Sequence, residues 1–278
     1  MRQAGESVCH LGGALARSVV SAIGSVLACS GSAPISPSFV PAPSVCEDAG
    51  LAPQFFRYAD LPCPLAADVE AVRGDVAITF DDVAWSPVVC EDVPNSMPLT
   101  YFEERVYQAL IFMRNVRFST PLPEKWTGGR ELYDWFRQAI RGIVVERGDR
   151  AYCCSPEKVI RLGMGDTSTI PVWRRTVVES WVPGIVHEAR HADIHIPHTC
   201  PTNHSKDAHT TDMGACGVQS WLMVWIAEYS DAPAETREWY RYSSKSFRFS
   251  AFCDECSNSP GTAQMSLSFL TPGMGPES

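Results

Sequence analysis

Histidines are unevenly distributed along this chain. Six of the seven lie within 23 residues, from His187 to His209, where random placement would put fewer than one. Imidazole is the commonest metal ligand among side chains and binds Zn²⁺ at about 2.0–2.1 Å. The cluster therefore predicts a metal site. Its members are His187, His191, His195, His198, His204 and His209.

Five consecutive residues of this cluster read His-Glu-Ala-Arg-His, from His187 to His191. On a helix, residues i and i+4 lie on one face about 6 Å apart, so both imidazoles can bind the same ion. Glu188 can lie beside that ion and accept a proton from a metal-bound water, which is general-base chemistry. The apolar residues 181–186 predict a buried start for such a helix.

This H-E-x-x-H motif resembles that of the zincin metallopeptidases. The resemblance covers a few tens of residues around 187–217 and not the whole chain. It implies Zn²⁺ as the cofactor, His187 and His191 as ligands, Glu188 as the general base, and a peptide or protein as the substrate.

The third ligand departs from the known zincin patterns. A metzincin has a glycine three residues and a histidine six residues after the second histidine, where this chain has Ile194 and Pro197. An aspzincin takes an aspartate followed closely by a Tyr-Gly pair. The segment 212–217, Asp-Met-Gly-Ala-Cys-Gly, is similar but has Cys for Tyr and a shifted spacing. A gluzincin takes a glutamate from a later helix, for which Glu228 is the natural candidate.

Helix geometry ranks the candidates for the third ligand. A continued helix would place His195 about 12 Å from His187, too far for both to share one ion. Pro197 ends the helix and lets the chain reverse, so His198 can return to the metal. Asp193 is a candidate for orienting a ligand ring by accepting its N–H. We expect His198 as the third ligand, and the alternatives are Asp212, His204 and Glu228.

The N-terminal region predicts export with a lipid anchor. Residues 18–28 form an eleven-residue stretch of apolar and small residues behind Arg17, which is the length of a signal-peptide core. The stretch ends in Val-Leu-Ala-Cys29, which resembles the lipobox of bacterial lipoproteins. Four prolines and five serines in 30–45 are typical of an extended tether. We expect a signal peptide over 1–28, a linker over 29–45, and a lipid-anchored location in the bacterial cell envelope.

The composition narrows the function classes. With 45% hydrophobic and 20% charged residues, the chain can build an ordinary globular core. The net charge of −9 argues against a nucleic-acid partner, because nucleic-acid binders normally carry a basic excess. The longest apolar run after the N-terminal region is seven residues, 221–227, whereas a membrane-spanning helix needs about 20.

Eleven cysteines agree with an oxidising compartment. Nine follow Cys29, and because nine is odd, at least one of them is free or pairs between chains. A disulfide between Cys200 and Cys216 would stiffen the loop that follows the H-E-x-x-H motif, so we favour this pair. Cys253 and Cys256 form a C-x-x-C motif, and the chain has no second such motif with which a zinc-thiolate site could be completed. This favours an ordinary disulfide role.

The elements that would position these residues are mostly helical. Apolar periodicity predicts helices over 99–118, 131–147, 173–193, 217–229 and 234–243. Thr100 and Glu103 have the spacing of a capping box at the start of the first helix. Strands are predicted over 76–80 and 158–162, and the region 46–96 is otherwise loop-rich.

We therefore expect a mainly α fold, or α+β with little strand, in a single helix-rich zincin-like domain over 46–256. A disordered tail is expected over 257–278. The predicted function is an exported zinc metallopeptidase, anchored to the membrane through Cys29.

Two rival functions remain open. One is a lipid-anchored binding or structural protein whose metal only fixes the fold. Four protein ligands would mark such a site, whereas three ligands and a water mark catalysis. The other rival is a zinc hydrolase that acts on a non-peptide amide or ester.

Overall fold

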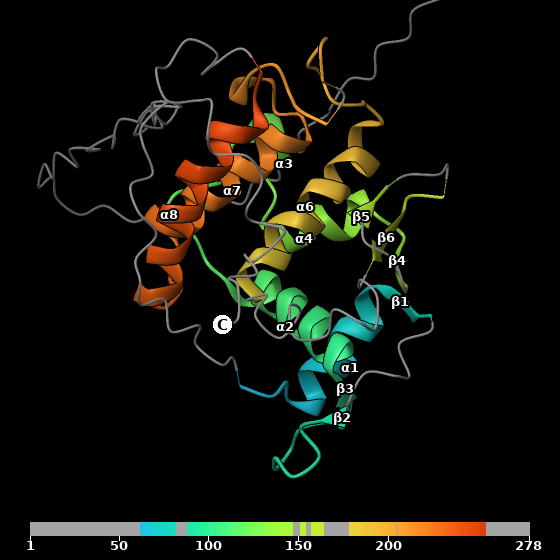
Figure 1. Cartoon of the computed structure of the whole chain (residues 1–278). Helices are drawn as coiled ribbons and strands as arrows, with labels where there is room; N and C mark the ends of the chain where they lie inside the picture. Colours follow the sequence, from blue (N-terminus) through green and yellow to red (C-terminus); the bar gives the residue numbers. More distant parts are fainter. Residues whose placement is uncertain are drawn as a thin grey trace, which may run out of the picture. The chain divides into compact units, whose positions relative to one another are not determined.

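The computed structural model describes residues 62–81, 88–146, 151–153, 157–163, 178–203 and 205–253 (Figure 1). All of them belong to one compact unit, Ala42–Ser278. The signal peptide, Cys29, the linker over 29–45, the tail over 257–278 and His204 lie outside the described residues, so the expectations for them stay predictions. None of the described helices is long and apolar enough to cross a membrane.

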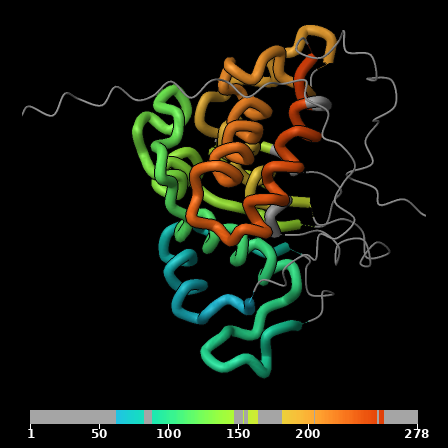
Figure 2. Tube along the Cα trace, turned by 90° about the vertical axis from the view of Figure 1, so that its left-hand side faces the viewer, coloured from blue at the N-terminus to red at the C-terminus, as the bar shows by residue number. Residues whose placement is uncertain are grey.

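Helices dominate the described structure, which confirms the helix-rich α+β class. The first half contains α1 (Ala66–Asp75), α2 (Tyr101–Asn115), α3 (Glu124–Thr127) and α4 (Leu132–Ala139). The second half contains α6 (Val178–Ile194), the 3-10 turn η2 (Thr210–Asp212), α7 (Ala215–Tyr229) and α8 (Ala234–Ala251). Helices α7 and α8 pack side by side, as Figure 2 shows in orange and red.

The main sheet has the strand order β1-β4-β6-β5. Its members are β1 (Ala77–Phe80), β4 (Gly142–Glu146), β5 (Ala151–Tyr152) and β6 (Val159–Gly163). Strands β1, β4 and β6 are parallel, and β5 pairs antiparallel with β6 at one edge. The parallel pair β1–β4 requires a long crossover, which α2, α3 and α4 provide. A separate two-stranded ladder joins β2 (Val88–Val89) to β3 (Leu99–Thr100).

Helix α2 begins where the sequence predicts. The Thr100 side chain accepts a hydrogen bond from the Glu103 amide, and the Glu103 carboxylate accepts one from the Thr100 amide at 2.7 Å. These reciprocal bonds satisfy two amides that a helix start otherwise leaves unpaired. The buried face of α2 includes Phe102, Val106 and Leu110, and the helix packs against α6.

The predicted helix over 131–147 is wrong in its second half. Helix α4 ends at Ala139, and Gly142–Glu146 form strand β4 instead. This strand pairs with β1 on one side and β6 on the other. Its apolar β-branched run therefore lies in the centre of a sheet, and that pairing outweighs the helical pattern read from the sequence.

The sequence prediction also missed α1 and underestimated α8. Helix α1 buries only Val69 and Val72, so its apolar pattern was too sparse to separate it from a loop. Helix α8 continues to Ala251, eight residues beyond the predicted end at 243. The end of α8 is important below, because it reaches the candidate site.

Helix α6 carries the H-E-x-x-H motif and continues through Pro183. It packs against α7 and α2 and contacts strand β6 (Figure 1). The side chains that face this core lie three or four residues apart, as a helical stripe requires. They are Val182, Ile185, Val186, Ala189 and Ala192. Burial of this stripe leaves His187 and His191 on a partly exposed face of the helix.

Candidate metal centre

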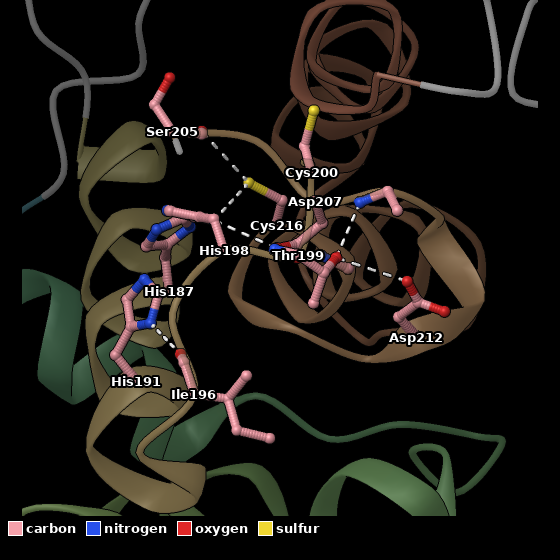
Figure 3. A network of polar contacts seen from close by, with 12 residues as sticks. His187, His191, Ile196, His198, Thr199, Cys200, Ser205, Asp207, Asp212 and Cys216 are labelled. Carbon is pink, nitrogen blue, oxygen red and sulfur yellow. Dashed lines mark hydrogen bonds and ion pairs between the residues drawn. The ribbon is translucent and has the colours of Figure 1, made fainter. Parts of the chain in front are cut away.

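Three histidine rings meet beside α6 (Figure 3). The ring centroids are 5.0 Å apart for His187 and His191, 5.1 Å for His187 and His198, and 4.7 Å for His191 and His198. Imidazoles that share one tetrahedral ion through a nitrogen hold their centroids roughly 5 Å apart. The structure thus brings together the three histidines that the sequence predicts as ligands.

In each of these rings, Nδ1 is in hydrogen-bond contact with an oxygen. The pairs are His187 with the Gln219 amide oxygen at 2.8 Å, His191 with the Ile196 carbonyl at 3.0 Å, and His198 with the Asp207 carboxylate at 3.1 Å. These oxygens accept hydrogen bonds, so Nδ1 carries the proton in a neutral ring. The lone pair of each ring is then on Nε2, where a metal can bind.

Burial keeps two of the rings in the neutral form that a metal needs. Burial is the main cause that lowers the pKa of His187 to about 3, and His191 and His198 lower it further. The pKa of His191 is also below its ordinary value, again because of burial. Both imidazoles are therefore uncharged at neutral pH and available as ligands.

The chain reverses direction earlier than the sequence suggests. Helix α6 ends at Ile194, and the His195 amide donates to the His191 carbonyl at 2.9 Å. His195 has a φ of 52°, the left-handed conformation that commonly ends helices. The reversal therefore occurs at His195 and not at Pro197. It directs the exposed His195 side chain away from the core and returns His198 to the other two rings.

Asp207 is, with Gln219, a residue of the site that sequence reasoning missed. It is fully buried, and its carboxylate accepts hydrogen bonds from His198, from the Gly217 amide at 3.1 Å and from the Thr199 amide at 3.3 Å. Burial alone would raise the pKa of Asp207, but these hydrogen bonds hold it below the ordinary value. The anion therefore orients the His198 ring. A single aspartate in a polar loop gives no sequence signal for this role.

Asp193 does not orient a histidine, contrary to the prediction. Its carboxylate accepts from the Trp135 indole at 3.1 Å and from the Arg190 guanidinium at 2.7 Å. Arg190 is buried and also donates to the Met213 carbonyl at 2.9 Å. This pair therefore fixes α6 to α4 and to the turn before α7.

The other described candidates for the third ligand lie elsewhere. Asp212 caps η2, and Figure 3 places it beyond Thr199 from the histidine rings. Glu228 is near the end of α7, where it forms an exposed ion pair with Arg241 at 2.8 Å. Of the three candidates that the structure describes, only His198 joins the cluster.

Glu188 follows His187 on α6 and is buried, with 8% of its surface exposed. Burial raises its pKa to about 7, although His198 opposes the rise. A carboxylate with a pKa near neutrality can both accept and return a proton, which is the property of a general base. A cation bound by the neighbouring histidines would lower this pKa again.

A free, buried thiol lies beside His198. Cys216 is buried, and its Sγ is 3.6 Å from Nδ1 of His198. Ligand atoms of His187, His198 and Cys216 all lie within 4.8 Å of one another. Burial raises the pKa of the Cys216 thiol, so the group is protonated at neutral pH unless a metal binds it.

The favoured disulfide between Cys200 and Cys216 is wrong. Cys200 pairs with Cys253, which is 53 residues away, and a second disulfide joins Cys63 to Cys90. Cys253 reaches Cys200 because α8 runs back along α7, a long-range relationship that spacing along the chain does not reveal. The ordinary disulfide role predicted for Cys253 is confirmed.

No known protein family, curated protein or solved structure matches this chain. Function must therefore come from the chemistry of the site, since a fold by itself does not specify an activity.

Proposed function

We propose that this chain is a zinc-dependent hydrolase, and specifically a metallopeptidase of the zincin type. His187, His191 and His198 are the ligands, and Glu188 is the general base. One observation carries the proposal: three rings converge, and an oxygen faces Nδ1 of each ring. Three imidazoles suit Zn²⁺ and leave a fourth position for a water, which is typical of catalytic sites.

The chain's own residues supply the rest of the reaction. When bound, Zn²⁺ supplies a Lewis acid that activates water and polarises the scissile carbonyl. Glu188 accepts the proton of the attacking water and delivers it to the leaving amine. Its burial limits access of bulk water to that proton. Asp207 keeps the His198 ring in the orientation and tautomer that present Nε2.

The sheet supports a peptide substrate over a small amide or ester. Among the described strands, β5 is at the edge of the sheet and is paired only with β6. Strand β5 also contacts α6, the helix that carries the motif. An edge strand offers unpaired backbone groups to an extended peptide, which can add to the sheet. With the lipid anchor predicted at Cys29, the enzyme would act at the membrane surface of the cell envelope.

A test of the reaction uses Glu188→Gln, because the amide fills the same space but cannot take the proton. The full chain and the variant are loaded with zinc and incubated with an unfolded protein, and new peptide termini are counted by mass spectrometry. Zinc content should stay unchanged while the cleavage rate falls about 10²–10⁴-fold. Full activity of Glu188→Gln would contradict the assignment of Glu188 and the peptidase proposal with it.

A second candidate function has one specific observation in its favour. Because Cys216 lies within ligand distance of His187 and His198, its thiolate could complete a closed four-ligand site. Such a site would hold the fold together without catalysing a reaction. In this arrangement, Sγ approaches His198 on the Nδ1 side, where Asp207 already binds.

The variant Cys216→Ser separates the two candidates. In the hydrolase, Cys216 is not a ligand, so the variant should keep both zinc affinity and cleavage. In a structural site, loss of the thiolate should release zinc and lower the melting temperature of the zinc-loaded protein. Cys216→Ala serves as the control for the polarity of the new hydroxyl.

A further inference from the structure

The segment that carries His198 is covalently joined to the end of α8. Cys200, two residues after His198, forms a disulfide with Cys253, two residues after the end of α8. Both sulfur atoms thus belong to segments at the candidate metal centre, although the two residues are 53 positions apart.

Between these two segments lies the backbone of Asp207. The Asp207 amide donates to the Ala251 carbonyl at 3.1 Å, and the Cys253 amide donates to the Asp207 carbonyl at 3.1 Å. On the other side, the Cys200 amide donates to the Lys206 carbonyl at 3.0 Å. We call Cys200, Asp207, Cys253 and the backbone that joins them the ligand clamp. Its carboxylate is the one that orients His198.

The clamp has little freedom to rearrange. Asp207 is fully buried, Cys200 is 1% exposed, and Phe252 is 4% exposed. Phe252 packs with Ala251 and Cys216, next to the start of α7. A buried carboxylate is strongly stabilised by its donors, so a shift of the 251–253 segment would be transmitted to Asp207 and from there to His198.

We infer that the Cys200–Cys253 disulfide holds the third ligand in place, so that zinc affinity depends on the oxidation of this bond. The inference rests on the proposed metal centre. Without the bond, only backbone hydrogen bonds and packing join the last turn of α8 to Asp207, and the closed loop of 53 residues opens. Asp207 then loses its fixed position, and His198 loses the partner that sets its ring.

The second disulfide provides a matched control. Cys63–Cys90 joins the segment before α1 to the end of β2. Its neighbours include Glu104 and Ser96, which do not belong to the metal centre. Removing it takes away one covalent link of the same kind without touching the clamp.

The experiment compares the full oxidised chain with the double variants Cys200→Ser/Cys253→Ser and Cys63→Ser/Cys90→Ser. The dissociation constant for Zn²⁺ is measured by competition with a chromophoric chelator. The clamp variant should bind zinc about 10–100-fold more weakly, the usual cost of losing a partner that orients a ligand. The control variant should bind as the wild type does.

A second measurement applies if the clamp variant does not fold. The folded wild type is titrated with a water-soluble phosphine, which reduces disulfides. Each disulfide takes up two electrons and two protons to give two thiols, and the phosphine becomes a phosphine oxide with oxygen taken from water. Peptide mapping gives the fraction of Cys200–Cys253 reduced at each step. Zinc release should follow that fraction and not the reduction of Cys63–Cys90.

The outcomes are distinguishable. Unchanged zinc affinity in the clamp variant, or an equal loss in both double variants, overturns the inference. Loss of zinc affinity in the clamp variant alone upholds the inference. If Glu188→Gln also keeps full activity, the inference stands but the proposed peptidase function is overturned. A wild type that binds no zinc overturns both.

Discussion

A methyl group on Gly214 would lie 2.5 Å from Oδ2 of Asp207. The carboxylate is this close because it accepts the Gly217 amide at the start of α7. Unpaired amides and the helix dipole both favour a negative charge there. Residue 214 must therefore lack a side chain if Asp207 is to reach the helix and hold His198.

Gly214→Ala should weaken zinc binding about tenfold or more, because the new methyl displaces the carboxylate that orients His198. The control is Gly184→Ala in α6, where nothing lies within 4 Å of the added methyl. That change should leave zinc affinity unaltered and stabilise the fold by about 1 kcal/mol or less, since alanine favours a helix interior. Zinc titration and urea unfolding of both variants check this. Equal zinc affinities for the two would contradict the role of the close contact.

His198→Ala should lower zinc affinity far more than a change at His195, because only His198 reaches the other two rings. His195→Asn is the appropriate control, since asparagine tolerates the left-handed backbone at this position. Zinc titration of both variants, with Asp212→Ala beside them, decides between the candidates. Zinc loss in Asp212→Ala with full binding by His198→Ala would make the site aspzincin-like.

Thr100→Ala should destabilise the fold by about 1 kcal/mol, because it removes half of the capping box at the start of α2. Glu103→Gln should cost less, since the amide oxygen can still accept from the Thr100 amide. Both variants should keep wild-type zinc affinity. Urea unfolding measures the loss, and an unchanged midpoint for Thr100→Ala would show that the cap contributes nothing.

Local patterns predicted the parts of this structure that depend on neighbours along the chain. The spacing of Thr100 and Glu103 predicts the start of α2, and the apolar run 217–229 predicts α7. The i and i+4 histidines of α6 come together for the same reason. Helix geometry also favoured His198 over His195, although the turn occurs two residues earlier than expected.

Features that depend on distant segments could not be predicted in this way. Strand β4 exists because β1 and β6 flank it. The role of Asp207 depends on its burial between the His198 segment and the end of α8. The same packing of α8 brings Cys253 next to Cys200, with which it forms a disulfide. His198 is nine residues from Asp207, but the contacts that bury Asp207 come from residues 251–253. Period and spacing along the chain contain no information about such distant partners.

The oxygens that face the three Nδ1 atoms come from separate parts of the chain: α7, the turn after α6, and the loop before η2. The unfolded chain therefore lacks this arrangement. Under the proposed function, we expect folding and oxidation of Cys200 and Cys253 to precede metal loading. Scarcity of zinc would then leave folded but inactive molecules, which regain activity when zinc returns.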